Sequence, residues 1–163
     1  MMQKFIGTKI IAAKPMTRMA YNELRGWTLP ADENGADEGY LVEYQNGGKP
    51  NHADFAGYIS WSPKEQFENA YRETSGMPFG LAIEALKKGL KFCRAGWNGK
   101  GMFLILIEPL EYQVDNHTDV VLFTMHGQNN LLPWIGIKTA DDKFVPWVAS
   151  QADMLADDWM IVD

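Results

Sequence analysis

The segment from Arg72 to Pro78, RETSGMP, is the feature that most limits how this chain can fold. It places Thr, Ser, Gly and Pro together between two stretches with a helical pattern, and such clusters interrupt regular structure. The chain has 163 residues, which is enough for one ordinary domain or for two small ones. We therefore predict two modules, residues 1–73 and residues 77–163.

The first module is predicted to contain strands and helices. Residues 5–12 are expected to form a strand, and a short helix is expected to begin at Thr17 and to end at Gly26. Two later segments, YLVEY at 40–44 and GYISW at 57–61, alternate in the period-2 manner of half-buried strands.

A second helix is predicted directly after these strands. Ser62 and Glu65 have the spacing of a capping box, with Pro63 at the first helical position, so this helix is expected to run to about Tyr71. The acidic segment 29–39 is predicted to be a long turn.

The second module begins with an amphipathic pattern and continues in strands. Phe79, Ile83, Leu86 and Leu90 share one helical face, and Gly89 is expected to end the helix. Strands are predicted at 102–107, 120–125, 133–138, 143–148 and 159–162. A brief helix capped by Ser150 and Asp153 is expected before the last strand. This order of elements is typical of the α+β class, here an antiparallel sheet with a packed N-terminal helix.

Composition excludes several classes of function. The net charge of −6 and a pI of about 5.0 argue against a broad surface for duplex nucleic acid, so an anionic ligand has to be bound locally. The single cysteine excludes an intramolecular disulfide and a four-thiolate zinc site. The apolar run near the N-terminus is broken by Lys9, Lys14 and Pro15 and is too short to span a bilayer. We expect a cytoplasmic protein with no membrane partner.

The familiar catalytic signatures are missing from the sequence. It contains no G-x-S-x-G, no H-E-x-x-H, no P-loop and no Rossmann fingerprint. The three histidines, His52, His117 and His126, lie in polar segments typical of solvated turns, and Cys93 is interpreted as a small core residue. The carboxylates of residues 31–38 lack the spacing of an EF-hand. We expect neither a metal site nor a cofactor.

The segment RAGWNGKGMF, residues 94–103, which we call the corner, is the first candidate site. Main-chain N–H groups of a Gly-containing turn can bind an anion, and Lys100 adds one positive charge. Trp97 offers a face on which a base can stack, and Asn98 can donate or accept at a base edge or ribose. The same residues also fit a tight Asn-Gly turn with Trp97 in the core.

A second polar and aromatic stretch, residues 138–153, is the other candidate. Ser150, Gln151 and Asp153 lie where a helix begins, so unpaired N–H donors accompany hydroxyl and amide groups. Trp147 lies just before them. The alternative interpretation is simple helix capping, with Trp147 and Trp159 in the core.

Two motifs in these stretches, GWNGKGM and PWVASQADMLADDW, closely resemble the phage-encoded Thoeris anti-defense 2 family, and the resemblance covers residues 77–163. It implies a non-enzymatic protein that binds cyclic ADP-ribose isomers, such as glycocyclic ADP-ribose, and holds them intact, so that the Thoeris effector is not activated. Capture of cyclic oligonucleotides, and homotetramers with ligand pockets at subunit interfaces, are also implied. The setting would be the cytoplasm of an infected bacterium. Residues 3–72 resemble a small phage-associated module of unknown function.

The motifs also imply which residues bind the ligand. The first candidates are Trp97, Asn98, Gly99 and Lys100, and the second are Thr139, Asp141, Trp147, Ser150, Gln151 and Asp153. Two residues depart from the family pattern: Pro78 stands where a small polar helix cap is expected, and Asp142 stands where the turn before Lys143 would carry glycine.

Two other functions remain open from the sequence. One is a phosphodiesterase or glycohydrolase that uses Asp141, Asp153 or Asp157 on the same signal. The other is a phage structural or interaction module in which both tryptophan motifs belong to the core.

Overall fold

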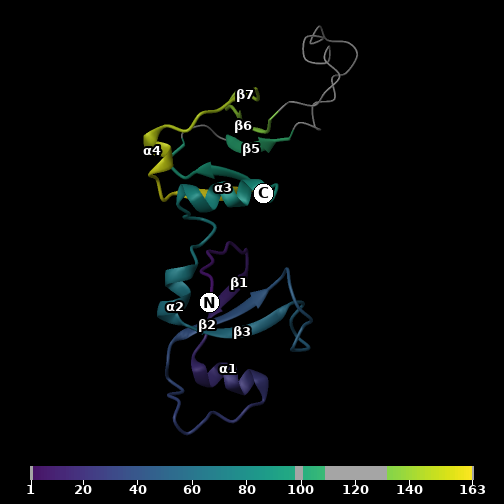
Figure 1. The fold of residues 1–163 in the computed structure, drawn as a ribbon, viewed down its shortest axis with the longest axis vertical. Coiled ribbons are helices and arrows are strands. Elements are labelled where there is room, and N and C mark those ends of the chain that lie inside the picture. Colours follow the sequence, from purple (N-terminus) through teal and green to yellow (C-terminus); the bar gives the residue numbers. More distant parts are fainter. Residues whose placement is uncertain (1, 98–100, 109–131, 163) are drawn as a thin grey trace. The chain divides into compact units, whose positions relative to one another are not determined.

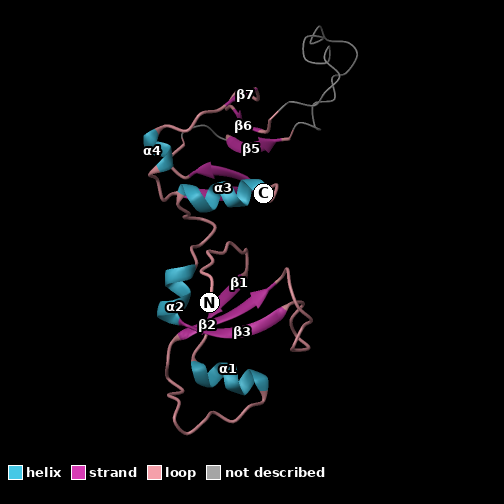
Figure 2. Ribbon diagram, viewed as in Figure 1, coloured by secondary structure: helices cyan, strands magenta, loops and turns pink. Residues whose placement is uncertain are grey.

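The computed structural model describes residues 2–97, 101–108 and 132–162 (Figure 1). The chain forms two compact units, Met1–Arg72 and Glu73–Asp163, which we call unit 1 and unit 2. Both combine helices with antiparallel strands, as Figure 2 shows, so the prediction of an α+β fold is confirmed.

Unit 1 is built on a three-stranded sheet in the order β1-β2-β3. Its elements are β1 (Ala12–Pro15), α1 (Arg18–Arg25), β2 (Gly39–Tyr44), β3 (Tyr58–Pro63) and α2 (Lys64–Ala70). The predicted bounds of α1 are confirmed. The Thr17 hydroxyl accepts a hydrogen bond from the Ala20 N–H, and Gly26 ends the helix at φ 66°, a left-handed conformation that glycine adopts easily.

Helix α1 supplies one hydrophobic cluster of unit 1. Tyr21 of this helix packs with Leu41 and Ile59 of the sheet, and all three side chains are buried. Helix α2 also packs against the sheet, where Phe67 stacks on Tyr40 with ring centroids 4.0 Å apart.

Two predictions for unit 1 are wrong, and in both cases strand pairing explains the difference. The strand expected at 5–12 is replaced by β1, which begins at Ala12. Ala12 pairs with Glu43, so residues before Ile11 would need partners beyond Tyr44, where β2 ends.

The capping box expected at Ser62 does not form. Strand β3 continues through Pro63, and Ser62 pairs with Tyr40 in the sheet. Helix α2 therefore begins at Lys64, with Pro63 as its N-cap and no side-chain hydrogen bond there.

Unit 2 contains a five-stranded antiparallel sheet in the order β7-β6-β5-β4-β8. Its elements are α3 (Phe79–Lys87), β4 (Lys91–Arg94), β5 (Phe103–Ile107), β6 (Trp134–Lys138), β7 (Phe144–Pro146), α4 (Gln151–Met154) and β8 (Trp159–Val162). Helix α3 packs against β4, β5 and β8. The core comprises Met77, Ala82, Leu86, Phe92, Leu104, Ile137 and Trp159.

Most of the elements predicted for unit 2 are confirmed, as α3, β5, β6, β7, α4 and β8. The strand expected at 120–125 lies outside the described residues. Strand β4, between β5 and β8 in the sheet, was not predicted. Only Phe92 of its four residues is buried, so the segment shows no clear alternation.

The ends of the elements in unit 2 also follow the sequence. Gly89 ends α3 with φ 81°, and Pro78 caps its start without a side-chain hydrogen bond. Asp142 adopts φ 63° in the turn between β6 and β7, a conformation that glycine would adopt without strain. The capping box of Ser150 and Asp153 is confirmed. Within the described ranges, no helix combines the length and apolar character that a membrane span requires.

Candidate functional site

The corner begins at the end of strand β4. After Arg94 the chain turns through Ala95 and Gly96 to Trp97, whose N–H donates to the Arg94 carbonyl over 3.1 Å. The Ala95 N–H donates to the main-chain carbonyl of Asp158 over 3.0 Å, which fastens the turn to the start of β8. Three predicted ligand residues of the corner, Asn98, Gly99 and Lys100, lie outside the described residues.

Three indoles from separate segments form what we call the indole cluster: Trp97, Trp147 and Trp159. Trp97 and Trp147 meet edge to face with ring centroids 6.5 Å apart and planes inclined by 65°. Their centroids lie 5.7 Å and 6.0 Å, respectively, from that of Trp159.

The three indoles differ in burial. Trp159 is fully buried, as the core interpretation expected, while Trp97 and Trp147 pack against the core but stay partly exposed. The structure thus brings together one tryptophan from each of the two candidate stretches and leaves both accessible in part.

Thr139 and Asp141 lie in the turn between β6 and β7, where they bond to their own neighbours. The Thr139 hydroxyl donates to Asp141 Oδ1 over 2.6 Å, and Lys143 Nζ lies 2.6 Å from Asp141 Oδ2. The Lys143 ammonium, and after it the Thr139 hydroxyl, lower the pKa of Asp141. At the base of this turn, Lys138 Nζ donates to the Gly101 carbonyl over 3.3 Å, which ties the turn to the far end of the corner.

Ser150 and Asp153 form the capping box at the start of α4. The Ser150 N–H donates to Asp153 Oδ2 over 3.0 Å, and the Asp153 N–H donates to Ser150 Oγ over 3.2 Å. The hydrogen bond from the Ser150 side chain is the largest cause of the lowered pKa of Asp153. Gln151, the first residue of α4, is exposed.

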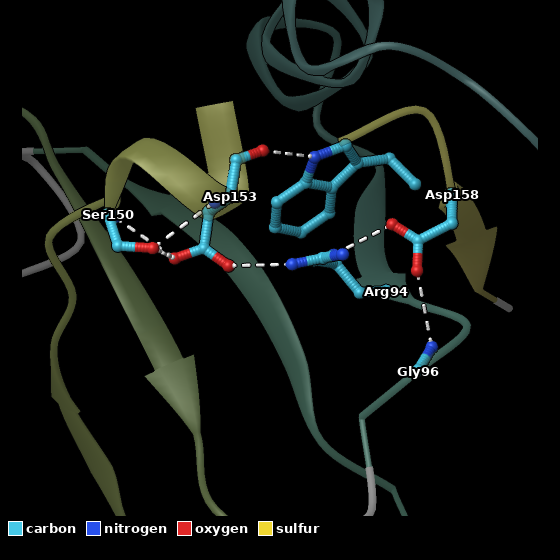
Figure 3. A network of polar contacts seen from close by, with 6 residues as sticks. Arg94, Gly96, Ser150, Asp153 and Asp158 are labelled. Carbon is cyan, nitrogen blue, oxygen red and sulfur yellow. Dashed lines mark hydrogen bonds and ion pairs between the residues drawn. The ribbon is translucent and has the colours of Figure 1, made fainter. Parts of the chain in front are cut away.

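Sequence reasoning missed Arg94, which connects the two stretches (Figure 3). Its Nε donates to Asp158 Oδ1 over 2.7 Å, and its Nη1 donates to Asp153 Oδ1 over 3.2 Å. Asp158 Oδ2 in turn accepts the Gly96 N–H over 3.3 Å. The guanidinium is the main cause of the lowered pKa of Asp158.

No local spacing could have revealed this network. Arg94 is 64 residues from Asp158 and 59 from Asp153, and the three meet only because β4 and β8 pair and α4 precedes β8. Arg94 pairs with Trp159, the residue after Asp158. This pairing brings the side chains of Arg94 and Asp158 to the same end of the sheet.

Asp141 and Asp153, two of the three carboxyl groups considered for an enzyme, are poorly suited to proton transfer near neutral pH. Asp141 and Asp153 are held as ions by their partners and have lowered pKa values, whereas a general acid or base works best with a pKa near the working pH. Indole faces and main-chain N–H groups are groups that bind bases and phosphates. Among the residues with described positions, no group of three or more His, Cys, Asp or Glu side chains could hold a metal ion.

Comparison with known proteins gives one family for unit 2. Residues 77–162 match the family model described as the Thoeris anti-defense 2-like domain. The protein "Thoeris anti-defense 2" of Bacillus phage SP01 is 44% identical to this chain over 89 residues, which cover 53% of this chain and 94% of that protein. The family match includes every element from α3 to β8 and none of unit 1.

Proposed function

This chain belongs to the Thoeris anti-defense 2-like family, and from that membership we propose that it blocks Thoeris defence by binding the cyclic nucleotide that carries the immune signal. The proposed ligand is a cyclic ADP-ribose isomer, such as glycocyclic ADP-ribose, which is held intact. A cyclic oligonucleotide is the other ligand that such a site would accept. The proposed place of action is the cytoplasm of the infected host.

The partial exposure of the neighbouring indoles of Trp97 and Trp147 is the structural observation that carries this proposal. A base held between two indoles needs parallel rings about 7 Å apart, twice the carbon contact distance. The two rings are 6.5 Å apart but inclined by 65°, so they do not form such a slot. The base would stack instead on the accessible face of one indole, a contact that contributes about 1–3 kcal/mol.

The phosphates need positive groups close by, because the chain as a whole has a net charge of −6. In the proposal, the main-chain N–H groups of residues 98–100 and the Lys100 ammonium bind them, because a turn rich in glycine can present several N–H groups to one anion. The residue that follows this segment, Gly101, accepts a hydrogen bond from Lys138, at the base of the β6–β7 turn.

The proposed protein binds its ligand without altering it. A phosphodiesterase or glycohydrolase would need a carboxyl group able to exchange a proton near neutral pH. Asp141 already pairs with Thr139 and Lys143, and Asp153 already pairs with Ser150 and Arg94. Sequestration has no such requirement, but it needs high affinity, because one protein removes one signal molecule. A nanomolar dissociation constant corresponds to about −12 kcal/mol.

Self-association into a homotetramer is also proposed. Unit 2 exposes several large apolar side chains along and after β7, namely Phe144, Val145, Val148, Met154 and Leu155. Exposed apolar side chains favour contact with another protein surface, and closed symmetric assemblies are the usual outcome for identical chains. Sedimentation equilibrium measures the number of chains directly.

Recovery of the ligand tests the central proposal. The full chain is incubated with a cyclic ADP-ribose isomer, separated from free ligand, denatured by heat, and the released material is chromatographed. We expect the unaltered isomer in amounts that match the protein. A new product that increases with time under excess ligand would establish an enzyme, and no retained ligand would reject the proposal.

A further inference from the structure

We infer that Arg94 is a positioning residue of the proposed binding site, which holds the start of the corner, residues 95–97, and the start of α4 in one fixed arrangement without contacting the ligand. The inference rests on the proposed function, because it assigns a role within that site. It concerns the first residue of the corner, which belongs to neither set of predicted ligand groups.

On the corner side, Arg94 acts through Asp158. One oxygen of this carboxylate accepts from Arg94 Nε over 2.7 Å, and the other accepts from the Gly96 N–H over 3.3 Å. Gly96 directly precedes Trp97 in the chain. The Arg94 guanidinium therefore holds the Asp158 carboxylate in place. This carboxylate in turn holds the backbone next to the Trp97 indole.

On the other side, Arg94 acts through Asp153. Asp153 Oδ1 accepts from Arg94 Nη1 over 3.2 Å, while Oδ2 accepts from the N–H and the hydroxyl of Ser150. Ser150 follows Trp147 by three residues. The main-chain carbonyl of Asp153 also accepts from Trp159 Nε1 over 3.0 Å, so the same residue holds the buried member of the indole cluster.

The charges argue against direct phosphate binding by Arg94. One guanidinium faces two carboxylates, and its side chain is only 23% exposed. A phosphate that approached this guanidinium would meet the negative charge of both carboxylates. A planar guanidinium can bond two carboxylates at once through different nitrogens, whereas a lysine ammonium provides a single point of charge.

Isothermal titration with a cyclic ADP-ribose isomer tests the inference on the wild type, Arg94→Lys, Asp158→Asn and the double variant. We expect each single variant to bind about tenfold more weakly or worse. The double variant should bind no more weakly than the weaker single variant, because both substitutions break the same connection. Arg18→Lys is the matched control: Arg18 is also partly exposed and pairs with Glu33, but in unit 1, so it should leave the affinity unchanged.

The outcomes separate this inference from the proposed function. If the wild type binds no isomer, the proposed function fails. If the wild type binds and both single variants bind within about twofold of it, the positioning role is rejected. If Arg94→Lys weakens binding while Asp158→Asn preserves or strengthens it, Arg94 contacts the phosphate directly and the inference is also rejected. Should Arg94→Lys fail to fold, Asp158→Asn alone decides between these results.

Discussion

The indole of Trp97 meets the indole of Trp147 edge to face, with centroids 6.5 Å apart, although 50 positions separate the two residues in the chain. Both rings also contact Trp159, which is buried. Trp97 and Trp147 therefore pack against the same buried residue, so a substitution at one of them need not disturb the packing of the other.

Replacement of Trp97 or Trp147 by leucine separates stacking from packing. Leucine keeps apolar bulk but has no ring face, so the variant that loses the stacking indole should bind a cyclic ADP-ribose isomer roughly 5- to 150-fold more weakly. Partial burial should keep the loss of unfolding free energy below about 3 kcal/mol. Titration calorimetry and urea unfolding measure the two effects. Trp27→Leu, at an exposed tryptophan of unit 1, is the control.

Equal affinity in wild type, Trp97→Leu and Trp147→Leu would remove the basis of the proposed site. Complete unfolding of both variants would support the other interpretation of these motifs, in which the tryptophans serve only the core.

The two capping-box sequences should respond differently to the loss of their serine. Ser150→Ala removes a hydroxyl that accepts from the Asp153 N–H, and it should lower the free energy of unfolding by about 1 kcal/mol. Ser62→Ala should change it by less than about 0.5 kcal/mol, because Ser62 lies in β3 and caps no helix. Urea unfolding of the two variants checks this directly, and equal effects would contradict the assignment of these caps.

Acid should destabilise unit 2 through Asp153 and Asp158. Both carboxyls have lowered pKa values in the folded protein, and an unperturbed aspartate titrates near about 3.9. Their stabilising contribution is therefore present above about pH 4 and is lost as the pH falls through the lower folded values. Asp158→Asn should be less stable at pH 6, and its stability should fall less steeply between pH 5 and pH 2. An unchanged slope in urea titrations would exclude Asp158 as a source of the acid sensitivity.

The turn at Asp142 offers a gain in stability. Its φ of 63° is strained for a residue with a Cβ, so Asp142→Gly should raise the free energy of unfolding by about 0.5–1 kcal/mol. The ion pair with Lys138 that this change removes is largely exposed at Asp142 and contributes little. Asp142→Val should lower the stability by about 1–3 kcal/mol. Thermal unfolding compares the stabilities of the wild type and the two variants. A valine variant as stable as the wild type would show that the backbone at residue 142 is not strained.

Local sequence signals predicted the elements whose ends depend on nearby residues. Thr17, Gly26, Gly89 and the pair Ser150 and Asp153 act within a few residues of themselves, so their spacing was informative. The apolar runs that became β5 and β6 were equally clear, because each is continuous in the chain.

The remaining elements and contacts depend on residues that are distant in the sequence, and local patterns could not predict them. The start of β1 depends on where β2 ends, and Ser62 became a strand residue because it pairs with Tyr40. Strand β4 buries only Phe92 and carries no pattern of its own. The motifs marked Trp97 and Trp147, but the partners of Arg94, Asp153 and Asp158, come close to it only through the pairing of β4 with β8.

Strand β7 lies at one edge of the sheet and ends in Pro146. The neighbouring Trp147 N–H bonds inward to the Ile135 carbonyl, so in the alternating antiparallel pattern the backbone of residue 146 faces outward. Proline has no amide hydrogen to offer there, and a foreign strand that tried to extend the sheet would miss a bond at this point. Pro146 therefore protects this edge of the sheet against pairing with a strand of another molecule.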